Sequence, residues 1–216
     1  NTVTVLCSID GFANTVGDNA SDSTDYFTPG VSISKSCDDL VKAGDDIDCD
    51  VTVTNTSSGN TPALTCSVND TQAGGPLFND VLVGSVPLSY SYPAPAGDGT
   101  VDNTVTVLCS IDGFANTVGD DASDSTDYFT PSIAVWKTGD TVSKVGDTVY
   151  YTITLSNNSS ANTPDMDCVA SDTLLGPLFA AILPAGDTVL TPSRTVLPDD
   201  PDPLPNTVTL TCSPVG

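Results

Sequence analysis

Two lysines of this sequence fall where a strand pattern turns them toward a protein core. Lys35 follows Val31 and Ile33 at a spacing of two residues, and such side chains share one face of a strand. If the strands run up and down, Lys35 lies at the same end of the sandwich as Asp70 and Asn103, and all three face inward. The same arrangement recurs further along the chain, in a set made of Lys137, Asp172 and Asn206.

Two kinds of chemistry suit these sets. A Lys–Asp ion pair capped by the Asn is the favoured interpretation, because a lysine is rarely buried without a partner. The alternative is a spontaneous isopeptide bond between Lys and Asn. In that case burial lowers the pKa of the lysine, which attacks the Asn amide, and raises the pKa of the Asp, which donates a proton.

A second cluster of reactive groups lies in GDDASDSTD (119–127), with a copy at 17–25. Its four carboxylates suggest a Ca²⁺ site near a domain boundary, formed by Asp120, Asp121, Asp124 and Asp127. The spacing does not match an EF-hand loop, and Ca²⁺ is the one cofactor that the sequence suggests. The alternative is a solvated acidic surface that keeps the protein soluble and stops sheet edges from pairing.

Five asparagines match the N-x-[ST] pattern for glycosylation, namely Asn19, Asn55, Asn69, Asn157 and Asn158. Asn158 and Asn19 are expected in turns and are the better candidates for a glycoprotein. In a chain rich in Ser, Thr and Asn, several matches are expected by chance.

The composition excludes many activities. The chain has no His, five basic and 28 acidic residues, and a net charge of −23. Catalytic triads that use His are therefore impossible. Nucleic acid would be repelled by this charge. The most apolar stretch, LLGPLFAAILPAG (174–186), is too short to span a bilayer. We expect no enzymatic activity.

An internal repeat sets the domain organisation. Residues 1–29 recur at 103–131 with a single change, from Asn19 to Asp121, and residues 30–55 recur in diverged form at 132–157. We therefore expect the C-terminal part of one repeat (1–29), a complete repeat of about 102 residues (30–131), and a repeat that lacks its last strand or strands (132–216). This organisation suggests a segment of a longer tandem polymer; the alternative is a subunit that lends strands to a neighbour.

Alternating apolar residues and frequent turn residues predict an all-β fold, and the repeat length is that of an immunoglobulin-like sandwich. In the complete repeat, the expected strands are 31–37, 48–55, 63–70, a poorly defined stretch near 81–92, 103–111 and a last strand near 126–130. Pro131 ends the repeat almost without a linker, which predicts a stiff string of domains.

The order of these features resembles a known family. Along the sequence come, in order, a first-strand Lys, a Gly-Asp turn, VTVTN or TITLSN, a VND or ASD turn, and NTVTV. This order resembles the prokaryotic surface-protein "conserved repeat domain", which occurs in tandem arrays. The resemblance covers both repeats and implies an immunoglobulin-like sandwich in an extracellular or cell-surface setting. It implies no reaction.

The seven cysteines can be paired from the repeat register. Cys66 and Cys109 have counterparts in the next repeat, whereas Cys37 and Cys49 disappear together. We predict the disulfides Cys37–Cys49, Cys66–Cys109 and Cys168–Cys212, with Cys7 bonded to a cysteine outside the segment. Disulfides indicate a compartment outside the reducing cytosol; reduced, buried thiols are the alternative.

These features favour a structural component of an extracellular filament, stalk or surface layer, whose partners are copies of itself. An adhesin or glycan-binding module is the alternative. Trp136 falls in a first strand, however, and Tyr90 and Tyr92 have no counterpart in the following repeat.

Overall fold

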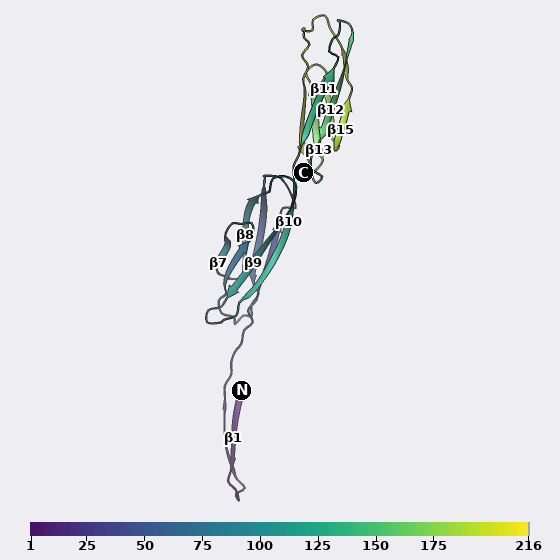
Figure 1. Cartoon of the computed structure of the whole chain (residues 1–216). Helices are drawn as coiled ribbons and strands as arrows, with labels where there is room; N and C mark the ends of the chain where they lie inside the picture. The colour runs from purple at the N-terminus through teal and green to yellow at the C-terminus, as the bar shows by residue number, and fades with distance from the viewer. Residues whose placement is uncertain (216) are drawn as a thin grey trace.

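The computed structural model describes residues 1–215, and each regular element in that range is a β-strand, so the predicted all-β class is confirmed. A two-stranded hairpin is followed by two β-sandwiches, one after another along an elongated molecule (Figure 1). The hairpin pairs β1 (Thr2–Ser8) with β2 (Thr15–Ser21). Within the described range there is no helix with the length and apolarity to cross a membrane.

The first sandwich, formed by β3 to β10, has a three-stranded and a five-stranded sheet. The smaller sheet has the order β3-β5-β8 and the larger one β4-β10-β9-β6-β7, in which only β4 and β10 are parallel. The strands are β3 (Val31–Cys37), β4 (Leu40–Lys42), β5 (Asp46–Asn55), β6 (Thr65–Asp70), β7 (Pro76–Val81), β8 (Ser85–Pro93), β9 (Gly99–Ser110) and β10 (Val118–Phe129).

The second sandwich, formed by β11 to β17, repeats this plan with fewer strands. One sheet has the order β11-β12-β15, with β16 also paired to β12, and the other has the order β14-β13-β17. The strands are β11 (Ile133–Gly139), β12 (Thr148–Asn157), β13 (Met166–Asp172), β14 (Gly176–Ile182), β15 (Gly186–Leu190), β16 (Ser193–Thr195) and β17 (Val208–Pro214).

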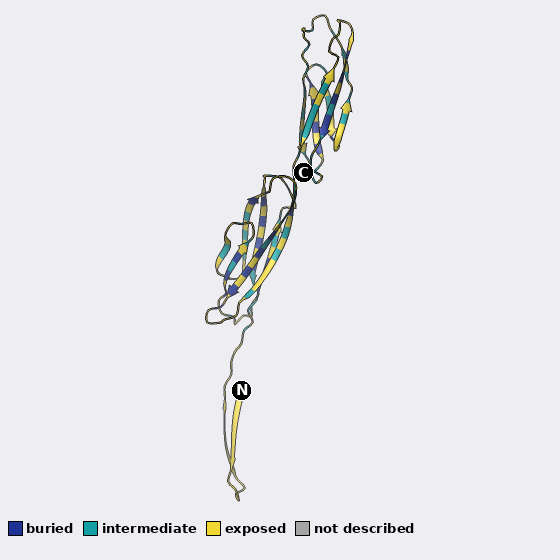
Figure 2. Cartoon of the chain, in the orientation of Figure 1, coloured by how far each residue is buried: buried dark blue, intermediate teal, exposed yellow. Residues whose placement is uncertain are grey.

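Each sandwich encloses its own apolar core, which explains the alternating burial along the strands in Figure 2. In the first sandwich, Val51 and Val53 of β5 pack in one cluster with Val105 and Val107 of β9. In the second, Ile153 and Leu155 of β12 pack with residues of β13. In β5 and β9, every second side chain is therefore directed toward the core.

The Gly-Asp turns that mark the repeat have a conformational cause. Gly44 and Gly146 have φ values of +85° and +91°, in the left-handed region that glycine adopts without a steric penalty. In each turn the following Asp N–H donates to the carbonyl of a lysine, Lys42 or Lys144. Both turns therefore lead into the long central strands, β5 and β12, in the same way.

Several predicted boundaries were wrong. The stretch near 81–92 contains the end of β7 and most of β8, separated around Gly84, which has a φ of +62°. The last strand begins at Val118 rather than near 126, because its acidic residues pair along β9. Strand β4 was not predicted, since its three residues gain their partner only from distant β10.

Candidate functional site

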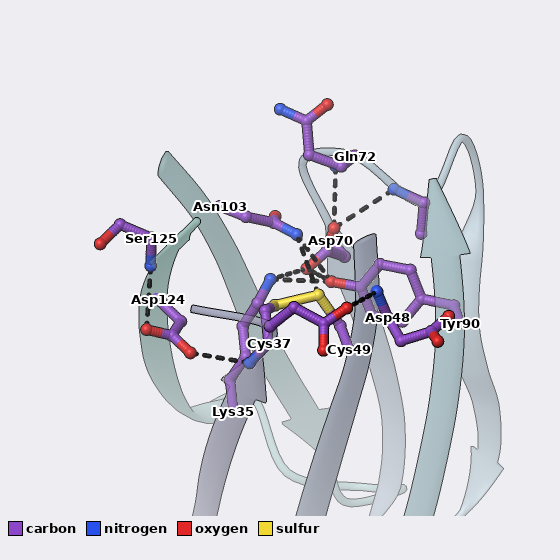
Figure 3. Close-up of a disulfide and its surroundings, with 12 residues drawn as sticks. Lys35, Cys37, Asp48, Cys49, Asp70, Gln72, Tyr90, Asn103, Asp124 and Ser125 are labelled. Carbon is purple, nitrogen blue, oxygen red and sulfur yellow. Dashed lines mark hydrogen bonds and ion pairs between the residues drawn. A yellow bond between two sulfur atoms is a disulfide. The ribbon is translucent and has the colours of Figure 1, made fainter. Parts of the chain in front are cut away.

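The inward lysine of the first sandwich sits among side chains from four strands (Figure 3). Strand β3 carries Lys35, β6 ends at Asp70, and β8 and β9 contribute Tyr90 and Asn103. The side chains of Lys35 and Asp70 have no exposed surface, and Asn103 is 1% exposed. The predicted grouping of Lys35, Asp70 and Asn103 at one end of the sandwich is present.

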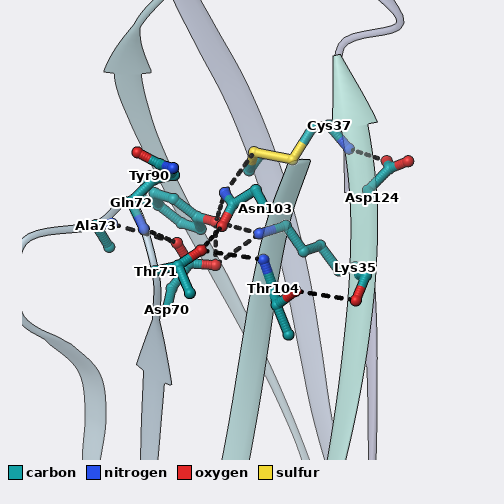
Figure 4. A network of polar contacts seen from close by, with 12 residues as sticks. Lys35, Cys37, Asp70, Thr71, Gln72, Ala73, Tyr90, Asn103, Thr104 and Asp124 are labelled. Carbon is teal, nitrogen blue, oxygen red and sulfur yellow. Dashed lines mark hydrogen bonds and ion pairs between the residues drawn. A yellow bond between two sulfur atoms is a disulfide. The ribbon is translucent and has the colours of Figure 1, made fainter. Parts of the chain in front are cut away.

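The phenol of Tyr90 is the centre of this network (Figure 4). Lys35 Nζ donates to Asp70 Oδ2 at 2.6 Å and to Tyr90 Oη at 2.7 Å. Tyr90 Oη donates to Asp70 Oδ2 at 2.5 Å and accepts from Asn103 Nδ2 at 2.8 Å. Lysine and asparagine therefore meet through one phenol oxygen, beside an ion pair.

The loop after β6 fixes the carboxylate and the amide. Asp70 Oδ1 accepts the backbone N–H groups of Gln72 and Ala73, at 2.8 and 3.2 Å. Thr71 Oγ1 donates to Asn103 Oδ1 at 2.8 Å. Each oxygen of these two side chains thus has a partner, as burial requires.

Burial and hydrogen bonding change the acidity of these groups. Burial lowers the pKa of Lys35, and the bond to Asp70 opposes this only in part. Burial acts to raise the pKa of Asp70, but the hydrogen bonds from Lys35, Tyr90 and the Gln72 N–H outweigh it, so this pKa lies below its usual value. The raised Asp pKa expected for the isopeptide alternative was therefore wrong. Burial and the neighbouring Asp70 raise the pKa of Tyr90, so the phenol keeps its proton.

The second sandwich has the same pair without that tyrosine. Lys137 Nζ bonds Asp172 Oδ2, whose other oxygen accepts N–H groups of Leu174 and Leu175. The position of Tyr90, opposite Cys49 in the sheet, is taken by Pro192 opposite Tyr151. The Tyr151 ring instead lies 4.5 Å from Lys137 Nζ.

Hydrogen bonds also fix Asp172 and Asn206 in the second sandwich. Burial acts to raise the pKa of Asp172, but the bond from Lys137 and the N–H groups of Leu174 and Leu175 hold it below its usual value. Asn206 Oδ1 accepts from Thr173 Oγ1 at 3.2 Å. Among the described residues, the buried Nδ2 of Asn206 has no hydrogen-bond partner.

The structure joins three cysteine pairs, Cys37–Cys49, Cys66–Cys109 and Cys168–Cys212. The Cys37–Cys49 bond lies directly beside the lysine network, and Asn103 Nδ2 approaches Cys49 Sγ to 4.0 Å. Cys7 is exposed on the hairpin, without a partner in residues 1–215.

The suggested Ca²⁺ site is not assembled. Asp120, Asp121, Asp124 and Asp127 lie along the extended strand β10, where successive side chains point to opposite faces, and residues 1–215 contain no group of three or more acidic or cysteine side chains suited to a metal. Asp120 and Asp124 instead accept the backbone N–H groups of Ile33 and Cys37, at 3.0 and 2.7 Å. These carboxylates therefore join the edge of β10 to that of β3.

The glycosylation candidates divide by exposure. Asn19, Asn69 and Asn158 are exposed, although Asn19 lies in strand β2 rather than in the expected turn. Asn55 and Asn157 are half-buried, and their Nδ2 atoms donate to the carbonyls of Leu82 and Leu183. A glycan on either of these two would break that bond.

The site also contains three residues that the sequence did not predict as part of it, namely Tyr90, Thr71 and Tyr151. The pattern of β8 held the signal for Tyr90, since it continues the inward face of Val86 and Leu88. Tyr151 stood out only as the replacement for a cysteine.

No protein-family model matches the chain, and no curated protein matches it. Many solved structures are similar, and three of them serve as examples. One is the CARDB domain of the PF1109 protein from Pyrococcus furiosus, in complex with di-metal ions, with 14% identity, a TM-score of 0.32, and coverage of 49% of this chain and 97% of that one. Another is the Yersinia pseudotuberculosis adhesin InvE, with 16% identity, a TM-score of 0.26, and coverage of 84% of this chain and 55% of that one.

The third is alpha-2-macroglobulin of E. coli, with 10% identity and a TM-score of 0.28. It is matched over 99% of this chain and 19% of that one, so the chain spans only part of this protein and of the adhesin. All three TM-scores are low, and these likenesses therefore say nothing about the ligands or activity of this chain.

Proposed function

We propose that this protein is a structural, non-enzymatic component of an extracellular filament, stalk or cell-surface layer built from tandem immunoglobulin-like repeats. The observation that carries the proposal is a junction that occurs twice. A loop after the central strand of each sandwich holds the chain segment that enters it, through the same hydrogen bonds at positions 102 residues apart.

At the first junction, Ser58 Oγ accepts the Thr28 N–H at 2.9 Å, and Asn60 Nδ2 donates to the Tyr26 carbonyl at 2.8 Å. The Ser58 N–H also donates to the Thr28 carbonyl at 2.9 Å. These bonds tie the segment from the hairpin to the first sandwich.

At the second junction, Ser160 Oγ accepts the Thr130 N–H at 3.0 Å, and Asn162 Nδ2 donates to the Tyr128 carbonyl at 2.7 Å. A connection held at several points resists bending, whereas a free linker does not. The repetition of one such junction favours a stiff array in which each repeat meets the next in the same way.

The hairpin supports the same proposal. Strands β1 and β2 pair in the register of their copies in β9 and β10, yet Val3 and Val5 are 66% and 52% exposed, whereas Val105 and Val107 are fully buried. Figure 2 shows the hairpin exposed along its length. We infer that residues 1–29 are the closing strands of a further repeat, and that Cys7 bonds a cysteine there.

Charge and disulfides suit an extracellular array. A net charge of −23 keeps neighbouring molecules apart, and disulfides persist in oxidising compartments. Electron microscopy of the native material tests the proposal. We expect long, uniform threads with a regular spacing of beads, and isolated particles would contradict it.

A paired variant examines the junction itself. Replacing Ser160 and Asn162 by Ala should shorten the maximum dimension measured by small-angle scattering, because the second junction then bends. The exposed pair Thr141→Ala and Ser143→Ala, in the same sandwich but away from the junction, is the matched control. An unchanged dimension in the junction variant would show that these bonds do not stiffen the array.

A further inference from the structure

Each sandwich places an amine, a carboxylate and a carboxamide close together. In the first sandwich all three are buried, whereas in the second the Lys137 side chain is 13% exposed and Asn206 is half-buried. The amine belongs to the first strand of each sandwich, β3 or β11, and the carboxylate ends the strand that carries the first cysteine of the shared disulfide, β6 or β13. The carboxamide lies within β9 in the first sandwich and two residues before β17 in the second. An ion pair needs only the first two groups. The carboxamide, which belongs to the buried Asn103 or the half-buried Asn206, is therefore the feature that an ion pair leaves unexplained.

In both sandwiches a hydroxyl of the neighbouring loop bonds the amide oxygen. A threonine hydroxyl donates to the amide oxygen in each case, Thr71 to Asn103 and Thr173 to Asn206. Such a donor stabilises the negative charge that an amide oxygen gains when a nucleophile adds to the carbonyl. The threonine follows the aspartate directly in both sandwiches, so one loop positions both the acid and the donor.

The two amide nitrogens differ in their partners. Asn103 Nδ2 meets only Tyr90 Oη and, at 4.0 Å, a sulfur atom. The buried Nδ2 of Asn206 has no partner in the described residues, and a buried donor without a partner is unfavourable. Loss of this nitrogen would remove the unfavourable group.

We propose that Lys35 and Asn103, and likewise Lys137 and Asn206, form intramolecular isopeptide bonds with release of ammonia. Asp70 and Asp172 transfer the protons. The bond ties the first strand of each sandwich to the opposite sheet, at β9 in the first sandwich and just before β17 in the second. It forms once per domain and is not a turnover activity.

The reaction balances without any other reagent. A proton moves from Lys35 Nζ to Asp70 Oδ2 along their 2.6 Å hydrogen bond, which leaves an amine and a carboxylic acid. The lone pair of Nζ then adds to Cγ of Asn103, and the electrons of the carbonyl move to Oδ1 beside Thr71. The adduct carries one excess proton on Nζ.

Collapse of this adduct restores the carbonyl and breaks the bond from Cγ to Nδ2. The leaving nitrogen takes the proton held by Asp70, and Nζ returns its excess proton to the same carboxylate. Ammonia departs with the remaining proton as ammonium, so a protonated lysine and an amide become a secondary amide and ammonium. Tyr90 Oη touches both Asp70 and Asn103 Nδ2, so in the first sandwich it relays the proton.

Intact mass of the full chain tests the proposal. After reduction and denaturation, the folded and purified protein should be lighter than its sequence by one ammonia, about 17 Da, for each bond. Digestion should give two branched peptides, one joining Lys35 to Asn103 and the other joining Lys137 to Asn206. A mass equal to that of the sequence, or linear peptides containing these residues, would overturn the proposal.

Matched variants assign the chemistry to each sandwich. In Asp70→Asn the mass deficit should shrink by one ammonia, and only the first branched peptide should disappear. In Asp172→Asn only the second branched peptide should disappear. Lys42→Arg, at an exposed lysine of the first sandwich, should keep both bonds. Persistence of the Cys66–Cys109 and Cys168–Cys212 peptides shows that the variants have folded, and a bond retained in Asp70→Asn would contradict the role of the acid.

Discussion

At the end of its first strand, the first sandwich joins Cys37 to Cys49, whereas the second places Gly139 against the ring of Tyr151. The two pairs occupy matching positions in the sheet. A methyl group on Gly139 would lie 2.7 Å from Tyr151 Cδ1, so the missing side chain makes room for the ring. The two replacements therefore depend on each other.

The strand that supplies the aromatic ring near the lysine also differs between the two sandwiches. Tyr90 reaches Lys35 from β8, with its ring centre 5.5 Å from Nζ, whereas Tyr151 reaches Lys137 from β12. The proline that replaces Tyr90 lies where the single strand β8 is divided into β15 and β16. Both sandwiches keep the Lys–Asp pair and an adjacent ring, while the disulfide and the strand that supplies the ring differ.

The largest expected effect comes from removing the carboxylate of each pair. Asp70→Ala should lower the free energy of unfolding of the first sandwich by about 3–5 kcal/mol, because it leaves a charge on the fully buried Lys35. Asp172→Ala should lower that of the second sandwich by less, since the Lys137 side chain is 13% exposed. Chemical denaturation measures both, with the single tryptophan, Trp136, reporting on the second sandwich.

Asp45→Ala is the control, because Asp45 forms an exposed pair with Lys42. We expect a change below about 0.5 kcal/mol for it. Equal losses for Asp70→Ala and Asp172→Ala would mean that the difference in lysine exposure has no energetic consequence.

Exchange of the two strand ends should give the next largest effect. Gly139→Cys combined with Tyr151→Cys should form a disulfide in the second sandwich, since the two residues face each other across β11 and β12. A loop of this length contributes about 3 kcal/mol in the chain-entropy model, less the lost ring contact with Lys137. Thiol titration and the melting temperature measure the outcome.

The single variant Tyr151→Cys is the matched control, because it removes the ring without permitting the bond. If the double variant keeps both thiols free, the ends of β11 and β12 do not have the geometry that joins Cys37 to Cys49 in the first sandwich. The reverse exchange in the first sandwich, Cys37→Gly with Cys49→Tyr, should destabilise it by a similar amount.

A smaller difference should follow from strand β10, which has no counterpart among the described strands of the second sandwich. Asp124→Ala removes the acceptor of the Cys37 N–H and should destabilise the first sandwich by about 1.5 kcal/mol, whereas Asp124→Asn keeps an acceptor and should cost less. Hydrogen exchange at Cys37 should accelerate in the Ala variant. Unchanged protection would indicate that β9 alone holds β10 in place.

The smallest difference in stability between the two sandwiches is expected at low pH. The pKa values of Asp70 and Asp172 both lie below that of an unfolded carboxyl, so each carboxylate stabilises its folded sandwich at pH values above about 3.9. This stabilisation is lost as the pH falls through the folded pKa. Denaturation from pH 7 to 2 should therefore weaken both sandwiches in the same range and leave their order unchanged; loss that begins above pH 5 would contradict the lowered pKa values.

Much of this architecture could be predicted because it is local or repeated. Alternation fixed the inward face of β3 to the residue, from Val31 to Cys37, and the same parity turned Lys35 inward. The repeat register indicated which cysteines belong together, and the structure joins those pairs. An alternating sequence determines which side chains share a face, since the period of a strand is a property of its own backbone.

The tertiary structure decided those contacts between strands that neither the repeat nor the alternation indicated. Asp120 and Asp124 looked like part of an ion site, but they accept N–H groups of β3, because β10 lies against an edge that its own pattern does not reveal. Tyr90 bonds Lys35 because β8 pairs with β5 in one particular register. Contacts between distant strands depend on register and sheet order, and these are set by the packing of the whole sandwich rather than by any one segment.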